Sequence, residues 1–206
     1  WFQRSKKTII TIIQGFGNVG KAVARFLTER GVIIIATCDK AGAIHDPKGI
    51  NIPALIEFKN SGRCVQDSGL GESLRHEEML QMESDIFIPS ARPDVFSVDN
   101  QHWLKTKLVL EGANIPITHD AAEIMVDRGI VIVPDVIANG GGVICAATEY
   151  QGMNEKQAFE RIESTISQNT REELERTLKQ GHYPHSASIM MAKERLKEAM
   201  TFRAHM

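Results

Sequence analysis

The stretch TIITIIQGFGNVGKAVARFL, at residues 8–27, joins a β-branched run to three glycines spaced as G-x-G-x-x-G. Residues 8–13 are apolar almost throughout, which is typical of a parallel strand buried on both of its faces. Apolar residues at helical spacing follow the glycines until Gly31, which is expected to end that helix. A second apolar run at residues 32–37 completes a predicted strand–turn–helix–strand unit.

The pattern GFGNVG stands in the context that a dinucleotide-binding turn requires. It follows a strand, opens a helix, and is followed by an acid, Asp39, about twenty residues further on. Gly15 permits a tight turn, Gly17 lets a pyrophosphate approach the backbone, and Gly20 lets the helix pack close to the sheet. The N–H groups at the helix start attract phosphates. We therefore predict cofactor contacts from Gly15, Phe16, Gly17, Asn18, Val19, Gly20 and Asp39.

Asp39 is expected to accept hydrogen bonds from both hydroxyls of the adenosine ribose. This favours NAD over NADP, because a 2′-phosphate would meet a carboxylate. Lys40 is adjacent and is able to reach a phosphate, so NADP stays possible as the cofactor. The alternatives are that Lys40 is a solvated turn lysine, and that the whole glycine pattern is a turn that binds no ligand.

The rest of the chain continues the alternation of strands and helices. Strands are predicted at residues 85–88, 108–110 and 130–133, and helices at 51–59, 73–81 and 118–128. This order predicts an α/β fold with a doubly wound, mostly parallel sheet of the Rossmann type. Residues 143–206 are rich in helix formers, so we expect a helical C-terminal segment after a sheet core over 1–142. Together the core and this segment are expected to form one dinucleotide-binding domain over 1–206.

Composition narrows the classes of function. The formal net charge is −2 with acids and bases mixed, so no basic block indicates nucleic-acid binding. The longest apolar runs are too short to span a bilayer, and no signal peptide is recognised. Cys38, Cys64 and Cys145 form no CxxC pair, which argues against a metal site and favours free thiols. We expect a cytoplasmic protein that binds no metal, nucleic acid or membrane.

Three later segments, taken together with GFGNVG, indicate a family. They are DIFIPSA at 85–91, LEGANIPITHDA at 110–121 and VPDVIANGGGV at 133–143. In this order they resemble the cofactor domain of the glutamate/leucine/phenylalanine/valine dehydrogenase family, and a small-residue helix at 186–192 extends the resemblance. It implies NAD(P)-dependent, reversible oxidative deamination of an L-amino acid to a 2-oxo acid and ammonia. It also implies a homo-oligomer, a hexamer in the full-length protein.

The resemblance assigns further cofactor contacts to four residues. Ser90 and Ala91 match the turn that passes beside the nicotinamide-side ribose. Asn114 matches the asparagine that contacts the nicotinamide end, and Asn139 matches one at the junction of cofactor and substrate. The residues alone leave other readings open, since Asn114 suits a turn and Asn139 suits a helix cap.

Val143 and Ala146 match positions in the family's substrate pocket. In members that act on glutamate, a serine three residues after this valine helps to hold the side-chain carboxylate. Members that act on branched-chain or aromatic amino acids carry an apolar residue there, as this chain does with Ala146. Glutamate is the expected substrate from the overall match, and a branched-chain or aromatic amino acid is the alternative. Helix packing alone is the other explanation of Ala146.

The family's catalytic lysine and aspartate lie in an N-terminal substrate domain, which this sequence is expected to lack. We therefore assign no catalytic residue within the chain and expect cofactor binding without turnover. A non-catalytic NAD-sensing module is the alternative function, although a sensor would not need the nicotinamide-end segments. The C-terminal helices are expected either to pack on the absent domain, with Met190 and Met191 exposed, or to bury these methionines in their own core.

Overall fold

The structure is a computed structural model that describes residues 8–203, with side chains up to Thr201. The chain divides into two compact units. The first ends at Val131 and the second begins at Ile132. The single domain predicted over 1–206, with its internal division at residue 142, stays a prediction.

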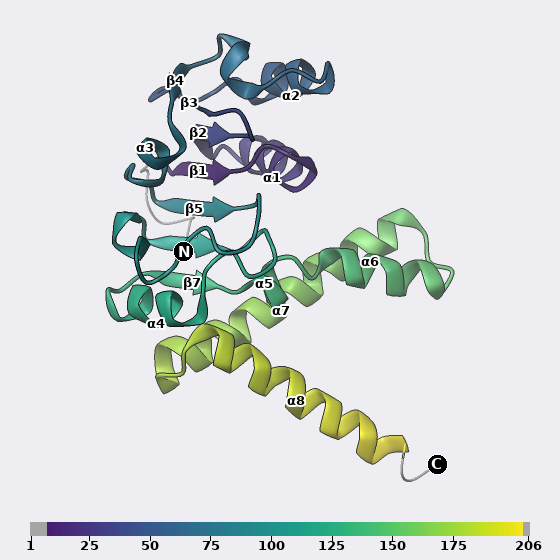
Figure 1. Ribbon diagram of the computed structural model, residues 1–206. Helices are drawn as coiled ribbons and strands as arrows, with labels where there is room; N and C mark the ends of the chain where they lie inside the picture. Colours follow the sequence, from purple (N-terminus) through teal and green to yellow (C-terminus); the bar gives the residue numbers. More distant parts are fainter. Residues whose placement is uncertain (1–7, 204–206) are drawn as a thin grey trace. The chain divides into compact units, whose positions relative to one another are not determined.

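Seven strands form one sheet among the described residues, in the order β4-β3-β2-β1-β5-β6-β7 (Figure 1). Their bounds are β1 Ile10–Gln14, β2 Ile33–Cys38, β3 Ala43–His45, β4 Glu72–Leu74, β5 Ile86–Pro89, β6 Leu108–Leu110 and β7 Val131–Val133. Strand β1 is parallel to both β2 and β5, and β5 is parallel to β6. The pairings of β3 with β2 and with β4 are antiparallel. The mostly parallel α/β sheet is therefore confirmed.

The first strand lies at the centre of the sheet, as its β-branched run predicts. Ile12 and Ile13 are fully buried, and they lie opposite Phe87 and Ile88 of β5. Successive side chains of a strand point to opposite faces of the sheet, so a central strand of a parallel sheet buries the side chains on both of its faces. Burial of each such side chain contributes about 1.5–3 kcal/mol to stability, which fixes the carboxyl end of β1 in place.

The helices of the first unit are α1 Asn18–Glu29, α2 Ile52–Asn60, α3 His76–Leu80 and α4 His119–Asp127, with short 3-10 turns η2 Val65–Ser68 and η3 Gln101–Trp103. Helix α1 ends before Gly31, whose φ of 79° explains why glycine stands there. The Asn51 side chain caps α2 by accepting a hydrogen bond from Ala54 N–H at 3.1 Å. These two helices confirm the sequence-based expectation.

The sequence-based prediction is wrong at the sheet edge that β3 and β4 form. A helix was expected over residues 73–81, but β4 occupies its start and α3 is only five residues long. Strand β3 was not predicted. Both strands have three residues, which is too short for an alternating pattern to be recognised, and their pairing depends on partners distant in sequence.

The second unit carries the predicted helical segment, among its described residues. Its helices are α5 Asp135–Ala138, α6 Gly141–Tyr150, α7 Glu155–Gln180 and α8 Pro184–Arg203. Gly152, with a φ of 73°, separates α6 from α7, and Asn154 caps α7 through a reciprocal pair of hydrogen bonds with Gln157. The Arg176 guanidinium joins α7 to α8 through a contact of 2.6 Å with Glu194.

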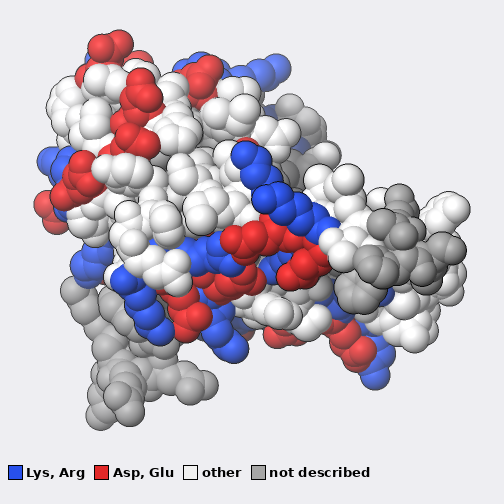
Figure 2. Space-filling model, turned by 90° about the horizontal axis from the view of Figure 1, so that it is seen from below, with Lys and Arg blue, Asp and Glu red and all other residues white. Residues whose placement is uncertain are grey.

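Charged side chains on the face shown in Figure 2 are interleaved, with Lys and Arg lying beside Asp and Glu. No block of one sign covers that face, which agrees with the mixed charge of the sequence. Among the described residues, no helix combines the length and the apolar character that crossing a membrane demands.

Candidate nucleotide-binding cleft

A cleft of about 840 Å³ opens in the first unit beside the carboxyl ends of β1, β2 and β5. Figure 1 shows these three strands side by side with their arrowheads pointing the same way. Ligands of parallel α/β sheets bind at this edge, and the volume lies in the range of small-molecule sites. The lining residues are Gln14, Gly15, Phe16, Gly17, Asn18, Lys21, Cys38, Asp39, Lys40, Lys59, His76, Glu77, Met79, Leu80, Ser90, Ala91, Arg92, Val95, Asn100 and Trp103.

The three glycines of the turn have different physical reasons to be glycine. Gly15 has a φ of +103°, and a Cβ there would lie 2.7 Å from the Cβ of Ala91. A Cβ on Gly20 would overlap the carbonyl oxygen of Gly15. Gly17 has an ordinary φ of −86°, and an added Cβ would meet no atom of residues 8–201 within 4 Å. Packing therefore requires Gly15 and Gly20, whereas only a ligand in the cleft would require Gly17.

Helix α1 presents its start to the cleft. Gly17 is the residue before its first turn, and the first N–H that bonds within the helix is that of Lys21, to the Gly17 carbonyl oxygen at 2.9 Å. No side chain of the described residues caps this end, and no acid stands in the first turn. The N–H groups of the first turn and the helix dipole are thus arranged to receive an anion such as a pyrophosphate.

The Asp39 carboxylate, predicted to bind ribose, already accepts three hydrogen bonds. Its Oδ2 accepts from Lys59 Nζ at 2.6 Å and from Val65 N–H at 2.9 Å, and its Oδ1 accepts from Ala41 N–H at 3.0 Å. A carboxylate has about four acceptor positions, so one is left. The expected binding of both ribose hydroxyls would therefore displace one of the present partners.

The charge state of Asp39 follows from the same contacts. Burial by itself would raise the pKa of this carboxyl. The hydrogen bond from Lys59, those from the backbone N–H groups of Ala41 and Val65, and the charge of Lys59 outweigh burial, so the pKa lies below its ordinary value. Burial also raises the pKa of the neighbouring Cys38 to about 12, which keeps that thiol protonated.

Several lining residues were not foreseen as part of the site. His76 Nε2 lies 2.6 Å from the carbonyl oxygen of Asp39 and therefore donates a hydrogen bond to it. Arg92 is exposed at the cleft, and Trp103 and Lys59 line it. No motif marks these residues, because they come from α2, α3, η3 and a loop that only the folded sheet brings to one edge.

The cleft brings together part of the predicted cofactor set, namely Gly15, Phe16, Gly17, Asn18, Asp39, Ser90 and Ala91. The Ser90 hydroxyl is buried without a hydrogen-bond partner among the described residues, which is unusual in folded proteins. Val19 and Gly20 belong to α1 but do not line the cleft, and Asn114 is an exposed loop residue outside the lining. The contacts of all these residues with a cofactor stay predictions.

The remaining predicted positions lie in the second unit. Asn139 is the residue that follows α5, where it ends that helix. Val143 is 77% exposed, and Ala146, also exposed, lies one turn further along α6. Thr148 is buried and donates its hydroxyl hydrogen bond to the Ile144 carbonyl oxygen, so its side chain lies on another face of α6. The pair Val143 and Ala146 is therefore accessible in this chain.

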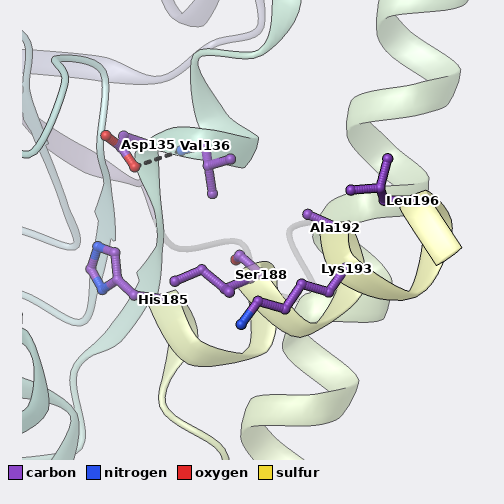
Figure 3. A pocket seen from close by; sticks show the side chains of 8 residues that line it. Asp135, Val136, His185, Ser188, Ala192, Lys193 and Leu196 are labelled. Atoms are coloured by element: carbon purple, nitrogen blue, oxygen red, sulfur yellow. Dashed lines mark hydrogen bonds between the residues drawn. The ribbon is translucent and has the colours of Figure 1, made fainter.

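A shallow groove of about 320 Å³ lies between α5 and α8 in the second unit (Figure 3). Figure 3 places Asp135 and His185 toward one end and Ala192 and Leu196 toward the other. The two adjacent methionines Met190 and Met191 of α8 differ, since Met191 is 3% exposed and Met190 is 37% exposed. Met191 is therefore buried and Met190 is partly exposed, while packing of this helix on a further domain stays a prediction.

Comparisons with known proteins point to one family. A family model described as Glutamate/Leucine/Phenylalanine/Valine dehydrogenase matches residues 3–204. A glutamate dehydrogenase of Aeropyrum pernix is 34% identical over 201 residues, covering 93% of this chain and 48% of that protein. An NAD-specific glutamate dehydrogenase of Staphylococcus aureus is 37% identical over 164 residues, covering 80% of this chain and 39% of that protein. The chain thus spans about half the length of the curated relatives it matches.

Solved structures share the fold. A hetero-hexameric glutamate dehydrogenase from Thermus thermophilus, in a Leu bound form, aligns with a TM-score of 0.82 at 22% identity, over 96% of this chain and 48% of that one. An L-tryptophan dehydrogenase from Nostoc punctiforme aligns with a TM-score of 0.74 at 23% identity, over 94% of this chain and 52% of that one. The architecture of sheet and helical segment is therefore one that known proteins adopt.

Proposed function

This chain belongs to the glutamate/leucine/phenylalanine/valine dehydrogenase family, and from that premise we propose that it is the NAD(P)-binding part of a glutamate dehydrogenase. The reaction would be the reversible oxidative deamination of an L-amino acid to a 2-oxo acid and ammonia. The observation that carries the proposal is the cleft at the start of α1, where Gly17 has no packing reason to be glycine. A bound NAD would supply a hydride acceptor there.

The described residues suggest how the cofactor is held. The N–H groups after Gly17 would receive the pyrophosphate, since the dipole of α1 favours an anion. Asp39 would hold the adenosine ribose through its remaining acceptor position. Ser90 and Ala91 would lie against the nicotinamide-side ribose, with Asn114 and Asn139 at the nicotinamide end. NAD is the proposed cofactor, and NADP is possible.

Glutamate is the proposed substrate because the relatives that match over most of this chain are glutamate dehydrogenases. Ala146 offers no hydroxyl to a substrate carboxylate, so a branched-chain or aromatic amino acid remains the second candidate. Val143 and Ala146 are exposed on α6, which is compatible with a place in the wall of a substrate pocket.

The catalytic acid and base of the proposed reaction are assigned to a substrate domain outside this chain. The length of the relatives supports this, because the chain spans about half of them. We further propose that the exposed apolar side chains along the groove between α5 and α8 (Val136, Ile189 and Leu196) pack on that domain, and that the full-length protein is a cytoplasmic homo-oligomer, a hexamer.

The test is an assay of the full-length gene product with NAD and a panel of glutamate, leucine, valine and phenylalanine. NAD reduction with glutamate as the preferred substrate is expected. Preference for leucine or phenylalanine would transfer the assignment to the second candidate. Cofactor binding without turnover of any amino acid would contradict an enzymatic function and favour a nucleotide-sensing module.

A further inference from the structure

The charge on Asp39, from which NAD selectivity was predicted, is paired with that on Lys59. Lys59 Nζ lies 2.6 Å from Asp39 Oδ2, and the two side chains are 19% and 8% exposed. A ribose-binding carboxylate disfavours NADP because its charge repels the 2′-phosphate. An ammonium in direct contact cancels most of that repulsion, and enclosure of the pair limits screening by salt. The electrostatic basis for excluding NADP is therefore weak here.

Lys59 is held at this position by the helix that carries it. Asn51 caps the start of α2, and Leu55 is buried in the core of the first unit. Lys59 then lies in the last turn, where the helix dipole favours a cation. Its ammonium has three donor hydrogens, of which the contact with Asp39 uses one. The remaining donors are available to an oxygen-rich anion that enters the cleft.

The rest of the lining adds to the positive charge. Lys21, Lys40 and Arg92 line the same cleft as Lys59, whereas the acids of the lining are Asp39 and Glu77. Lys21 Nζ donates a hydrogen bond to Asn60 Oδ1 at 3.1 Å, next to Lys59 in the sequence. A cleft with more cations than acids favours the nucleotide that carries the additional phosphate.

We propose that Lys59 is a specificity-determining residue, which masks Asp39 and offers its ammonium to a 2′-phosphate, so that the cleft accepts NADPH as well as NADH. This inference rests on the proposed nucleotide-binding function of the cleft. It differs from the sequence-based expectation, in which the Asp39 carboxylate favours NAD by meeting a 2′-phosphate and only Lys40 leaves NADP possible.

The experiment is an equilibrium titration of the full chain with NADH and with NADPH, followed by nucleotide fluorescence. For the unmodified chain, the two dissociation constants are expected to agree within about tenfold, because Lys59 offsets the repulsion between Asp39 and the 2′-phosphate. Lys59→Met should weaken NADPH relative to NADH by about tenfold or more, because Asp39 is then unmasked. Lys59→Arg retains the charge and should keep the original ratio.

Two further variants keep the result interpretable. Lys107→Met removes an ion pair of the same length, 2.6 Å to Asp85, at a site outside the cleft lining, and should leave the ratio unchanged. Asp39→Asn retains the size of the side chain but removes its charge, and should shift the ratio toward NADPH even if Lys59→Met folds poorly.

The outcomes separate the inference from its premise. One outcome is that the chain binds NADH but that its dissociation constant for NADPH is more than about a hundredfold higher, the effect of about two lost charged contacts. That outcome would overturn the role of Lys59 and leave the proposed function standing. An NADPH-to-NADH ratio that Lys59→Met does not change would do the same. Failure of the unmodified chain to bind either nucleotide would instead overturn the proposed function of the cleft.

Discussion

Replacement of Gly17 by alanine tests whether the cleft is built for a ligand. The added methyl group would meet no atom within 4 Å in the part of the chain that the structure describes, and the φ of −86° suits alanine. Alanine before a helix start costs up to about 1 kcal/mol relative to glycine, and a stiffer unfolded chain returns about 0.4–1 kcal/mol. The free energy of unfolding of Gly17→Ala should therefore stay within about 1 kcal/mol of the parent value.

The same methyl group should weaken cofactor binding. It would hold a pyrophosphate away from the N–H groups of α1, and each charge-assisted hydrogen bond lost costs about 1.5–3 kcal/mol. The dissociation constant for NADH should therefore rise about tenfold to a hundredfold. Urea unfolding and NADH titration of the same preparation measure both quantities. Gly20→Ala is the contrasting variant, because its Cβ would overlap the Gly15 carbonyl oxygen and should destabilise the fold. A folded Gly17→Ala with unchanged NADH affinity would refute the reasoning.

Three further predictions concern charge and the substrate. Asp39→Ala should weaken NADH relative to NADPH by about tenfold, because a ribose acceptor is lost and Lys59 is released; paired titrations check this, and an unchanged preference would remove Asp39 from the site. Burial raises the pKa of Glu173 to about 7 from an unfolded value of 4.5. The free energy of unfolding should therefore fall by about 3 kcal/mol in all as the pH rises from the lower to the higher value, because only the unfolded state ionises there. Urea unfolding across this pH range should show the loss of stability in the parent and in the control Glu175→Gln, which changes an exposed carboxylate. Glu173→Gln should not show it, and the same pH dependence of stability in all three proteins would contradict a buried, protonated Glu173. Ala146→Ser in the full-length gene product should raise kcat/KM for glutamate relative to leucine by about twofold to tenfold, the worth of one added hydrogen bond, and an unchanged ratio would exclude Ala146 from the pocket.

Local patterns predicted the parts of the fold that local interactions decide. The strand β1, the glycine turn and the capped helix α2 follow from residue type and spacing alone, since propensity, turn geometry and capping act within a few residues. The short antiparallel strands β3 and β4 did not follow, because three residues carry too little pattern. Such strands are defined by their partners.

The same distinction applies to the candidate site. Spacing located Gly15, Gly17, Gly20 and Asp39 and assigned Gly17 to the ligand and Gly20 to packing, but it could not show that Gly15 also packs against Ala91. That contact appears only when the space around each Cα is known. The contact of Lys59 with Asp39 joins residues twenty positions apart, and that of His76 joins residues thirty-seven apart. An ion pair between different helices and strands can therefore change the charge that a motif residue such as Asp39 presents to a ligand, although the motif itself is unchanged.

Binding of NADH to the chain tests the central claim most directly. Trp103 lines the cleft, so its emission should fall as NADH enters and accepts the excitation energy. We predict saturable quenching with a dissociation constant between about 1 μM and 1 mM, as for ordinary enzyme–ligand affinities. Trp103→Phe should lose the Trp103 quenching signal but should still bind NADH when binding is measured by calorimetry. Absence of saturable NADH binding to the folded chain, by quenching and by calorimetry, up to several times that upper value would contradict the assignment of the cleft as a dinucleotide site.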